Sequence, residues 1–425
     1  MSHAVTRAVH TRALYFPHMP HRRRARVGGL LLGLLISCAA AAPAQVLPED
    51  PISLAGGHVV LGGEVTFTVG PEDPGFFNYT TYEFSVLRNL RMSMSAEVRA
   101  NDHLQVLGEL RLDQLRVLEA YGLFVRIRPW PARRFDIQAG RIPPTFGAMT
   151  RTSYASDNLL IGQPLAYQYL TSLRPDAVPA TNEDLVRMRG RGWLSSFPIG
   201  NSVPAPGLPL VNTTRWDTGV GVHGVAGMIE WTGAVTAGSL SDPRLRDNNG
   251  GRQVAGRVVA KPTAAIELGL SASRGAWLNR TIDEEFVPAE SGDQSRQVAF
   301  GADAEYSAGP ILVRGEVIRS TWRMPGVPTL VLADPLVATS TLVEGRYRFA
   351  PGAYVAARGD WLRFSDVTGD RGISTWDADV VRTEIGVGYS FTRNIQVKGS
   401  WQHNVRDGGR VRRDGMFAGQ VLYWF

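Results

Sequence analysis

The chain ends in the stretch Phe417-Ala418-Gly419-Gln420-Val421-Leu422-Tyr423-Trp424-Phe425, which shows a two-residue rhythm. Successive side chains of a β-strand point to opposite faces, so every second residue shares a face. In an extended conformation, one face of this stretch carries Phe417, Gly419, Val421, Tyr423 and Phe425. We therefore predict a terminal strand that is apolar and aromatic on one face and continues to the last residue.

The same alternation recurs along the chain after its first 44 residues. In residues 90–99, the apolar series Leu90, Met92, Met94, Ala96 and Val98 alternates with a polar series. Further examples lie at 105–112, 343–349, 355–362, 382–391 and 395–402. No segment after the first 44 residues approaches the ~20 continuous apolar residues of a transmembrane helix. The pattern predicts an all-β chain whose strands have one apolar and one polar face.

Short turns and long polar segments alternate between these strands. Short turns fall at 100–103, 129–134, 224–226, 261–263, 307–310, 350–352 and 392–394. The longer segments fall at 70–83, 143–212, 240–251, 275–295, 323–337, 365–377 and 406–414, with a short exception near 113–116. We count about sixteen strands, and fourteen or eighteen if one hairpin is merged or split. The expected strands are 58–69, 85–99, 104–112, 117–128, 134–142, 213–223, 226–239, 252–260, 264–274, 296–307, 311–322, 338–349, 353–364, 378–391, 395–405 and 415–425.

Residues 1–44 have the character of a removable export signal. A basic region at 22–26 precedes an apolar region at 27–42, and Ala42-Pro43-Ala44 offers a small-residue cleavage site. A competing interpretation is a lipoprotein, because Leu35-Ile36-Ser37-Cys38 resembles a lipobox. Either interpretation predicts an exported protein.

Removal of this leader changes the charge of the protein. The whole chain has 45 basic and 39 acidic side chains, and residues 1–44 contain six of the arginines and no acid. The mature chain is therefore formally neutral, which gives no support for a nucleic-acid partner. The single cysteine, Cys38, lies in the leader, so the mature chain has no disulfide to stabilise it.

An exported chain of alternating strands that ends on an aromatic residue resembles the β-barrels of bacterial outer membranes. In such barrels the apolar face meets lipid and the polar face encloses a wet lumen. The sheet must close, because unpaired backbone groups are costly in hydrocarbon. The resemblance implies a signal peptide at 1–44, a periplasmic segment at 45–57 and a closed antiparallel transmembrane β-barrel at 58–425. It also implies that Tyr423 and Phe425 are read by the barrel assembly machinery.

The strand count and one long connection further resemble the porins. Segment 143–212 is far longer than ordinary connections, and such loops are often functional. In sixteen-stranded porins the third extracellular loop occupies this place and folds inward to constrict the pore. Residues 140–147 loosely resemble the matching segment of phosphate-selective porins, although Thr145 separates Pro144 from Phe146. We expect one long inward-folding loop, with an external cap that never enters the lumen as the alternative.

Charged residues of the loop and of the polar strand faces form the candidate constriction. The polar faces hold nine basic and six acidic side chains, a slight excess that favours anions, although these groups also serve simply to keep the interior wet. Tyr154, Tyr167, Tyr169 and Trp193 of the loop are expected to pack it against the wall. The candidate pore residues are Arg141, Arg151, Asp157, Arg174, Asp176, Glu183, Asp184, Arg187, Arg189, Arg191, Arg314, Glu344, Arg346, Arg358, Asp360, Arg382 and Glu384.

Catalytic and cofactor sites find little support in the sequence. The histidines of the mature chain, His58, His103, His223 and His403, are scattered without a metal-binding spacing. Segment 219–224 matches GxGxxG, but strand-like sequence flanks it on both sides, whereas a dinucleotide site lies between a strand and a helix. We expect no enzyme activity, no cofactor and no metal.

The sequence favours an outer-membrane porin that lets small hydrophilic solutes diffuse passively, with a mild preference for anions. The expected partners are outer-membrane lipid, the assembly machinery and small solutes or anions, and the resemblance implies a homotrimer as one assembly. The alternative function is a non-conducting barrel with an adhesive, structural or hydrolase role. The alternative fold is an exported β-sandwich, whose polar faces would be exposed rather than enclosed.

Overall fold

The computed structural model describes residues 47–79, 84–130, 134–286 and 295–425. The predicted signal peptide at 1–44, its cleavage site and Cys38 lie outside the described residues. Residues 48–425 form one compact unit. Among the described residues, no helix has both the length and the apolar character needed to cross a membrane.

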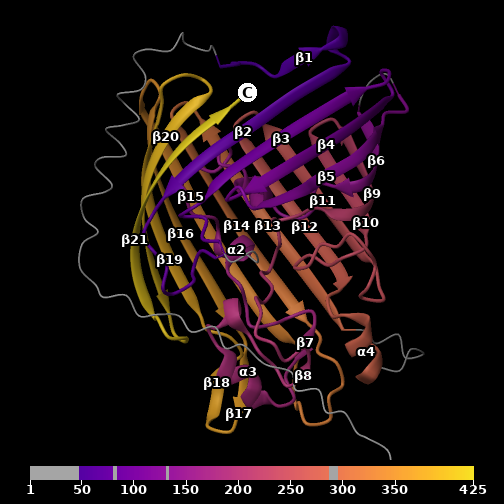
Figure 1. Cartoon of the computed structure of the whole chain (residues 1–425), viewed down its shortest axis with the longest axis vertical. Coiled ribbons are helices and arrows are strands. Elements are labelled where there is room, and N and C mark those ends of the chain that lie inside the picture. Colours follow the sequence, from indigo (N-terminus) through magenta and orange to yellow (C-terminus); the bar gives the residue numbers. More distant parts are fainter. Residues whose placement is uncertain (1–46, 80–83, 131–133, 287–294) are drawn as a thin grey trace, which may run out of the picture. The chain divides into compact units, whose positions relative to one another are not determined.

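Sixteen long strands form the wall of a closed antiparallel barrel (Figure 1). A short seventeenth strand, β1 (Ile52–Leu54), joins the sheet beside the first wall strand. The wall strands are β2 (Val59–Val69), β3 (Leu90–Arg99), β4 (Leu104–Asp113), β5 (Val117–Ile127), β6 (Phe135–Ile142), β9 (Asp217–Ala226), β10 (Ile229–Thr236), β11 (Gln253–Thr263), β12 (Ile266–Ala276), β13 (Arg296–Ala308), β14 (Ile311–Trp322), β15 (Leu336–Ala350), β16 (Ala353–Phe364), β19 (Val380–Ser390), β20 (Ile395–Arg406) and β21 (Arg413–Trp424). The predicted fold class and strand number are confirmed.

Two hairpin turns differ from the prediction. The turn expected at 261–263 lies at 264–265, because β11 continues to Thr263 and β12 begins at Ile266. The turn expected at 224–226 lies instead between β9 and β10 at Gly227, whose φ of 61° favours glycine. Gly224 is part of β9 and lies under the ring of Trp231, where a Cβ would overlap the indole. Gly224 and Gly227 both lie near this turn. Because Trp231 packs against Gly224, Gly227 is the glycine that occupies the turn.

The terminal strand β21 closes the barrel against β2. Glu64 to Val69 pair with Trp424 to Gly419. Phe425 and Gly63 exchange two backbone hydrogen bonds of 3.0 and 3.1 Å. Strand β1 then pairs with Val59–Leu61, the part of β2 that β21 does not reach. Strands β1 and β21 together cover this edge of β2.

The two faces of the wall differ as predicted. On β15 the side chains of Val343 and Tyr347 are each 50% exposed, whereas that of Glu344 between them is buried. Exposed aromatic residues Tyr347, Phe349, Tyr389 and Phe391 gather near the short turns, as expected for an interfacial girdle. The outer skin of the barrel is therefore apolar.

Long loops occur at the barrel end opposite β1 and the C-terminus (Figure 1). By the usual asymmetry of such barrels, this is the extracellular end. The short elements of the loops and the N-terminal segment are η2 (Ala55–Gly57), η3 (Met149–Ser153), α2 (Leu165–Gln168), β7 (Ala177–Val178), α3 (Asn182–Met188), η4 (Gly192–Leu194), β8 (Ile199–Gly200), α4 (Arg280–Phe286), β17 (Asp366–Gly369) and β18 (Gly372–Thr375).

The inner face is not polar throughout, contrary to the expected uniform alternation. Inward residues of the extracellular half, such as Ile318, Leu342 and Leu362, are buried in an apolar cluster with residues of the long loop, including Phe146 and Leu165. The loop supplies apolar side chains inside the barrel, so the wall facing it is apolar as well. The barrel thus has a core at its extracellular half.

We expect deletion of Phe425 to weaken closure more than Phe425→Ala. Alanine keeps both backbone hydrogen bonds to Gly63, whereas deletion removes them at a cost of about 1–3 kcal/mol. Urea unfolding of the lipid-folded barrel, followed by tryptophan fluorescence, measures the difference. Equal unfolding midpoints for the wild type and the deletion would contradict this account of the seam.

Candidate functional site

The long loop leaves β6 at Ile142 and runs inside the barrel before returning at Asp217. Every residue from 158 to 174 is buried. Backbone groups of this loop meet charged side chains that project inward from the wall. The prediction of an inward-folding loop is confirmed, and an external cap is excluded.

The first anchor of the loop is Glu316 of β14. Its carboxylate accepts hydrogen bonds from the Ala148 backbone N–H at 2.7 Å and from the Tyr167 hydroxyl at 2.7 Å. The Gly147 backbone N–H donates to Ser271 Oγ of β12 at 3.1 Å. Burial raises the pKa of Tyr167 well above its usual value, so the phenol is a hydrogen-bond donor. These contacts attach the start of the loop to β12 and β14.

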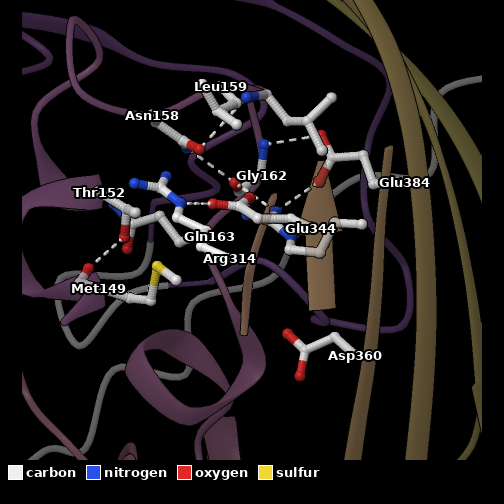
Figure 2. Close-up of polar contacts among 12 residues, drawn as sticks. Met149, Thr152, Asn158, Leu159, Gly162, Gln163, Arg314, Glu344, Asp360 and Glu384 are labelled. Atoms are coloured by element: carbon white, nitrogen blue, oxygen red, sulfur yellow. Dashed lines mark hydrogen bonds and ion pairs between the residues drawn. The ribbon is translucent and has the colours of Figure 1, made fainter. Parts of the chain in front are cut away.

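The central anchor is Gly162 between Glu384 of β19 and Arg358 of β16. Figure 2 shows the Glu384 carboxylate directed at Gly162, whose N–H donates to it at 2.9 Å. Arg358 Nη2 donates to the Gly162 carbonyl at 2.6 Å and to Glu384 at 2.7 Å. Both charged side chains are 0% exposed. A Cβ on Gly162 would overlap Glu384 and Gln402, so this close approach requires glycine.

Arg382 of β19 extends the central anchor toward the extracellular end. It donates to the carbonyls of Gln163 and Phe77 at 2.8 Å each and to Asn404 Oδ1 at 2.7 Å. Asp360 of β16 accepts a hydrogen bond from the Leu165 N–H. Arg382 therefore connects the long loop to the loop between β2 and β3.

Further anchors lie on β2, β4 and β20. Glu64 accepts from the N–H groups of Ala155 and Ser156 at 3.0 and 2.9 Å. Lys398 of β20 donates to the carbonyls of Ala155 and Asn158. Glu109 of β4 accepts from the Tyr154 hydroxyl at 2.6 Å. Because β4 and β14 are separate parts of the wall, the loop is attached across the lumen.

Several wall residues of the candidate constriction are buried. Glu344, Arg358, Asp360, Arg382 and Glu384, five of the pore-lining or constriction candidates, are almost completely buried. The two-residue alternation of the strands correctly predicted that these side chains point into the barrel. Alternation alone does not show which of them the loop covers. Arg314 pairs with Glu344 (Figure 2) and is 16% exposed, and Arg346 lies in electrostatic range of Arg314 and Arg348.

Arg141 of β6 and Arg174 of the long loop both make structural contacts. Arg141 donates to Glu119 at 2.7 Å and to the carbonyls of Ala120 and Trp216. Arg174 is fully buried and pairs with Asp176 at 2.8 Å. Neither side chain projects into open space.

The remaining charged loop residues are more exposed. Arg151 pairs with Asp157 at 2.8 Å, and the Arg151 side chain is 79% exposed. Helix α3 begins with a capping box in which Thr181 and Asp184 bond to each other's backbone N–H. Asp184 also pairs with Arg187, while Arg191 is exposed.

Contacts of α3 place this part of the loop at the extracellular mouth. Glu183 accepts from the Asp370 N–H at 3.1 Å, and Arg189 pairs with Asp407 at 2.6 Å. Both partners lie in loops at that end. In the described part of the chain, no hydrogen bond or ion pair joins Glu183, Asp184, Arg187, Arg189 or Arg191 to the arginines of the wall.

The aromatic residues of the loop pack against neighbouring side chains, as predicted. Tyr167 and Tyr169 are each 2% exposed. Trp193 stacks on Phe76 of the loop between β2 and β3, with ring centroids 3.6 Å apart. Tyr154 lies beside Arg111, which also covers the Tyr121 ring at 3.5 Å.

Asp377 is an anchor that the sequence did not indicate. Its carboxylate accepts from the N–H groups of Ser172 and Gly190 at 2.6 and 2.7 Å. Burial raises the pKa of Asp377, while these N–H donors and that of Ala378 act in the opposite direction. Asp377 stands in an irregular loop without periodicity, so no pattern pointed to it. Glu64, by contrast, has inward strand parity.

Open space remains at the periplasmic end and beside the loop. A vestibule of about 550 Å³ is lined by residues that include Arg99, Arg126 and Arg128. Two gaps of about 30 Å³ each flank the loop; one touches Glu64 and Arg91, the other Asp217. Within residues 47–79, 84–130, 134–286 and 295–425, no cluster of three potential metal ligands occurs.

We expect Glu384→Gln to loosen the loop while the barrel stays closed. The change removes the 2.7 Å ion pair of Arg358 and leaves Glu344, at 3.5 Å, as its remaining buried carboxylate partner. Breaking a buried ion pair typically costs about 3–5 kcal/mol. Limited proteolysis should then cut within 143–212, and the barrel should remain resistant. Glu230→Gln is the control, because Glu230 pairs with Lys261 at an exposed turn. Identical digestion of the two variants would contradict the anchoring role.

Comparisons with known proteins show the fold and no sequence family. No protein-family model and no curated protein matches the chain. OmpF of Salmonella typhi superposes with a TM-score of 0.51 and 15% identity, covering 86% of this chain and 97% of OmpF. An anion-selective porin from Comamonas acidovorans (TM-score 0.50, 9% identity) and a loop-deleted OmpT of Vibrio cholerae (0.50, 12%) each cover 86% of this chain and 99% of their own. The chain therefore has the fold of outer-membrane porins.

Proposed function

We propose that the protein is an outer-membrane channel for passive diffusion of small hydrophilic solutes. The observation that carries this proposal is the closed barrel with an apolar skin, whose lumen is crossed by its own long loop between β6 and β9. Such a barrel encloses a path isolated from lipid. The loop narrows that path, which limits the size of the solute. The proposed role is transport without catalysis.

The polar gaps beside the loop are the proposed route. The gap near β2 is lined by Glu64, Thr66, Asn89 and Arg91 together with loop residues such as Ser153. A volume of about 30 Å³ holds one or two waters. Passage of anything larger requires the loop to shift from its anchors. We therefore infer a low conductance that rises when the anchors are weakened.

A mild preference for anions follows from the vestibule. Its lining contains Arg99, Arg126 and Arg128 against Glu97 and Asp102. Glu97 is paired with Arg99 at 2.7 Å, so Arg126 and Arg128 supply most of the remaining positive field. Arginine at this position attracts anions without holding them firmly.

A sealed barrel is the second candidate, and the complete burial of residues 158–174 favours it. In that case the loop is a permanent plug and the protein has a structural, adhesive or rim-hydrolase role. The two candidates differ in one measurable property, the current through a single folded barrel.

The proposed partners follow from the fold and the terminal strand. Outer-membrane lipid surrounds the apolar skin, and the assembly machinery reads the strand that carries Tyr423 and Phe425. The porin resemblance supports a homotrimer as the assembled form. Because Phe425 also seals the wall, its two roles need separate measurements.

Planar-bilayer recording of the purified barrel should show small ohmic steps, and Glu384→Gln should enlarge them. The expected increase has a physical cause, because the released loop no longer fills the lumen. Glu230→Gln should conduct like the wild type. A barrel that folds but stays silent in both wild-type and Glu384→Gln forms would reject the channel and support the plug.

Reversal potentials in a salt gradient test the preference for anions. The double change Arg126→Gln and Arg128→Gln should shift selectivity toward cations, because it removes two positive charges from the lining of the vestibule. The opposite double change, Glu97→Gln and Asp102→Asn, should shift it toward anions. Unchanged reversal potentials in both would show that the vestibule does not set selectivity.

Phe425→Ala should lower the amount of barrel in the outer membrane of growing cells several-fold. In vitro folding into lipid should change little, because the backbone bonds to Gly63 remain. Membrane fractionation and the heat-dependent gel shift of folded barrels provide the two measurements. A parallel loss in both would assign Phe425 to folding alone.

A further inference from the structure

The lipid-facing surface of β10 to β14 carries an apolar groove of about 690 Å³. Its sides are the exposed side chains of Trp231, Leu270 and Phe300. Its floor contains Gly256 and Ala272, which pair with each other in the sheet and stand directly beside Phe300. Small residues among bulky ones leave a depression in the wall, large enough to receive a hydrocarbon chain.

Two exposed arginines stand at the extracellular end of this groove. Arg319 lines it and pairs across the sheet with Phe300, and Arg274 pairs with Val298 on the other side of β13. On each strand, the alternate residues whose side chains face lipid form an outward row. Arg274 and Arg319 belong to the outward rows of β12 and β14, near the extracellular ends of these strands. Neither has an ion pair or a side-chain hydrogen bond with any of the described residues.

The outward rows of β12 to β16 contain no carboxylate, and these strands are described in full. Their other charged residues are Arg296, which begins β13 and pairs with Ala276, and Arg363, which lies two strands beyond Arg319 across Thr339 and is within electrostatic range of Asp379. An arginine on the lipid face costs about 2–4 kcal/mol at mid-membrane and about 0–1 kcal/mol near the interface. Arg274 and Arg319 therefore fit best at the level of the lipid headgroups, where an anion can pair with them.

We infer that this groove binds a doubly phosphorylated glycolipid of the outer leaflet. One acyl chain lies in the depression formed by Gly256 and Ala272, while Arg274 and Arg319 each bind a phosphate. Arg274 and Arg319 lie on strands that are separated by one intervening strand, and they are offset by two residues along the strand direction. Because adjacent strands are about 4.8 Å apart, their Cα atoms are separated by roughly 12 Å. That separation suits two phosphates on one headgroup better than a single phosphate. Guanidinium groups bind phosphate in a bidentate manner.

The inference rests on the proposed outer-membrane location and does not depend on conduction. A second copy of the chain is the competing occupant of the groove. A copy that presented the same surface would add only positive charge, because the charged residues of these outward rows are all arginines. Charge complementarity therefore favours the lipid.

Native mass spectrometry of the folded barrel in non-ionic detergent tests the inference, with bisphosphorylated lipid A as the probe. The double variant Arg274→Gln and Arg319→Gln should bind it at least about tenfold more weakly, since each arginine near a membrane surface contributes about 1 kcal/mol. Monophosphorylated lipid A and phosphatidylglycerol should bind the wild type less tightly and respond less to the variant.

Two further variants make the test specific. Arg371→Gln with Arg410→Gln removes the same charge from exposed extracellular loops and should leave lipid binding unchanged. Ala272→Leu fills the depression without changing the charge and should weaken binding several-fold. Equal binding by both double-arginine variants would overturn the inference. So would lipid-free self-association that Ala272→Leu abolishes, which would assign the groove to a second copy. Single-channel currents, measured alongside, should not change in the Arg274 and Arg319 variant, which separates this site from the proposed channel.

Discussion

The need to pair every backbone N–H and C=O group within hydrocarbon governs this molecule. A sheet in lipid has no water to satisfy an open edge, so the sixteen wall strands must return to the first one. The return depends on a short seam, in which β21 pairs with Glu64–Val69 and Phe425 bonds to Gly63. Strand β1 covers the remaining part of the β2 edge. Closure then determines the rest, because it separates an apolar skin from an enclosed interior.

The same requirement explains the charged interior. A long loop without regular structure carries unpaired backbone groups, and burial makes each of them costly. The wall supplies the missing partners: Glu64, Glu316 and Glu384 accept from loop N–H groups, while Arg358, Arg382 and Lys398 donate to loop carbonyls. The inward charges therefore serve first to hold the loop in the lumen. Under the proposed function, charges away from these anchors, such as Arg126 and Arg128 of the vestibule, act on a solute.

Much of the fold could be predicted, because strand alternation and turn residues are local properties of the chain. The strand number, the inward parity of Glu384 and the outward parity of Tyr389 all follow from that periodicity. The β9–β10 turn could not be predicted as reliably, since Gly224 and Gly227 are both suitable turn residues and only the packing of Trp231 on Gly224 distinguishes them. The anchors were partly visible: parity pointed to Arg358, but no local pattern pointed to Asp377.

By itself, the sequence determined that the chain forms alternating strands, that their apolar face is continuous enough for lipid, and that one connection is exceptionally long. These properties depend on residues within a few positions of one another. The tertiary structure alone decided where that connection lies and which charges it buries. Gly162 meets Glu384 across 222 positions of sequence, and Arg382 reaches Phe77 across 305. Whether an inward charge faces water or a loop backbone depends on such distant contacts, because solvation is set by everything that packs around a group and not by its neighbours in the chain.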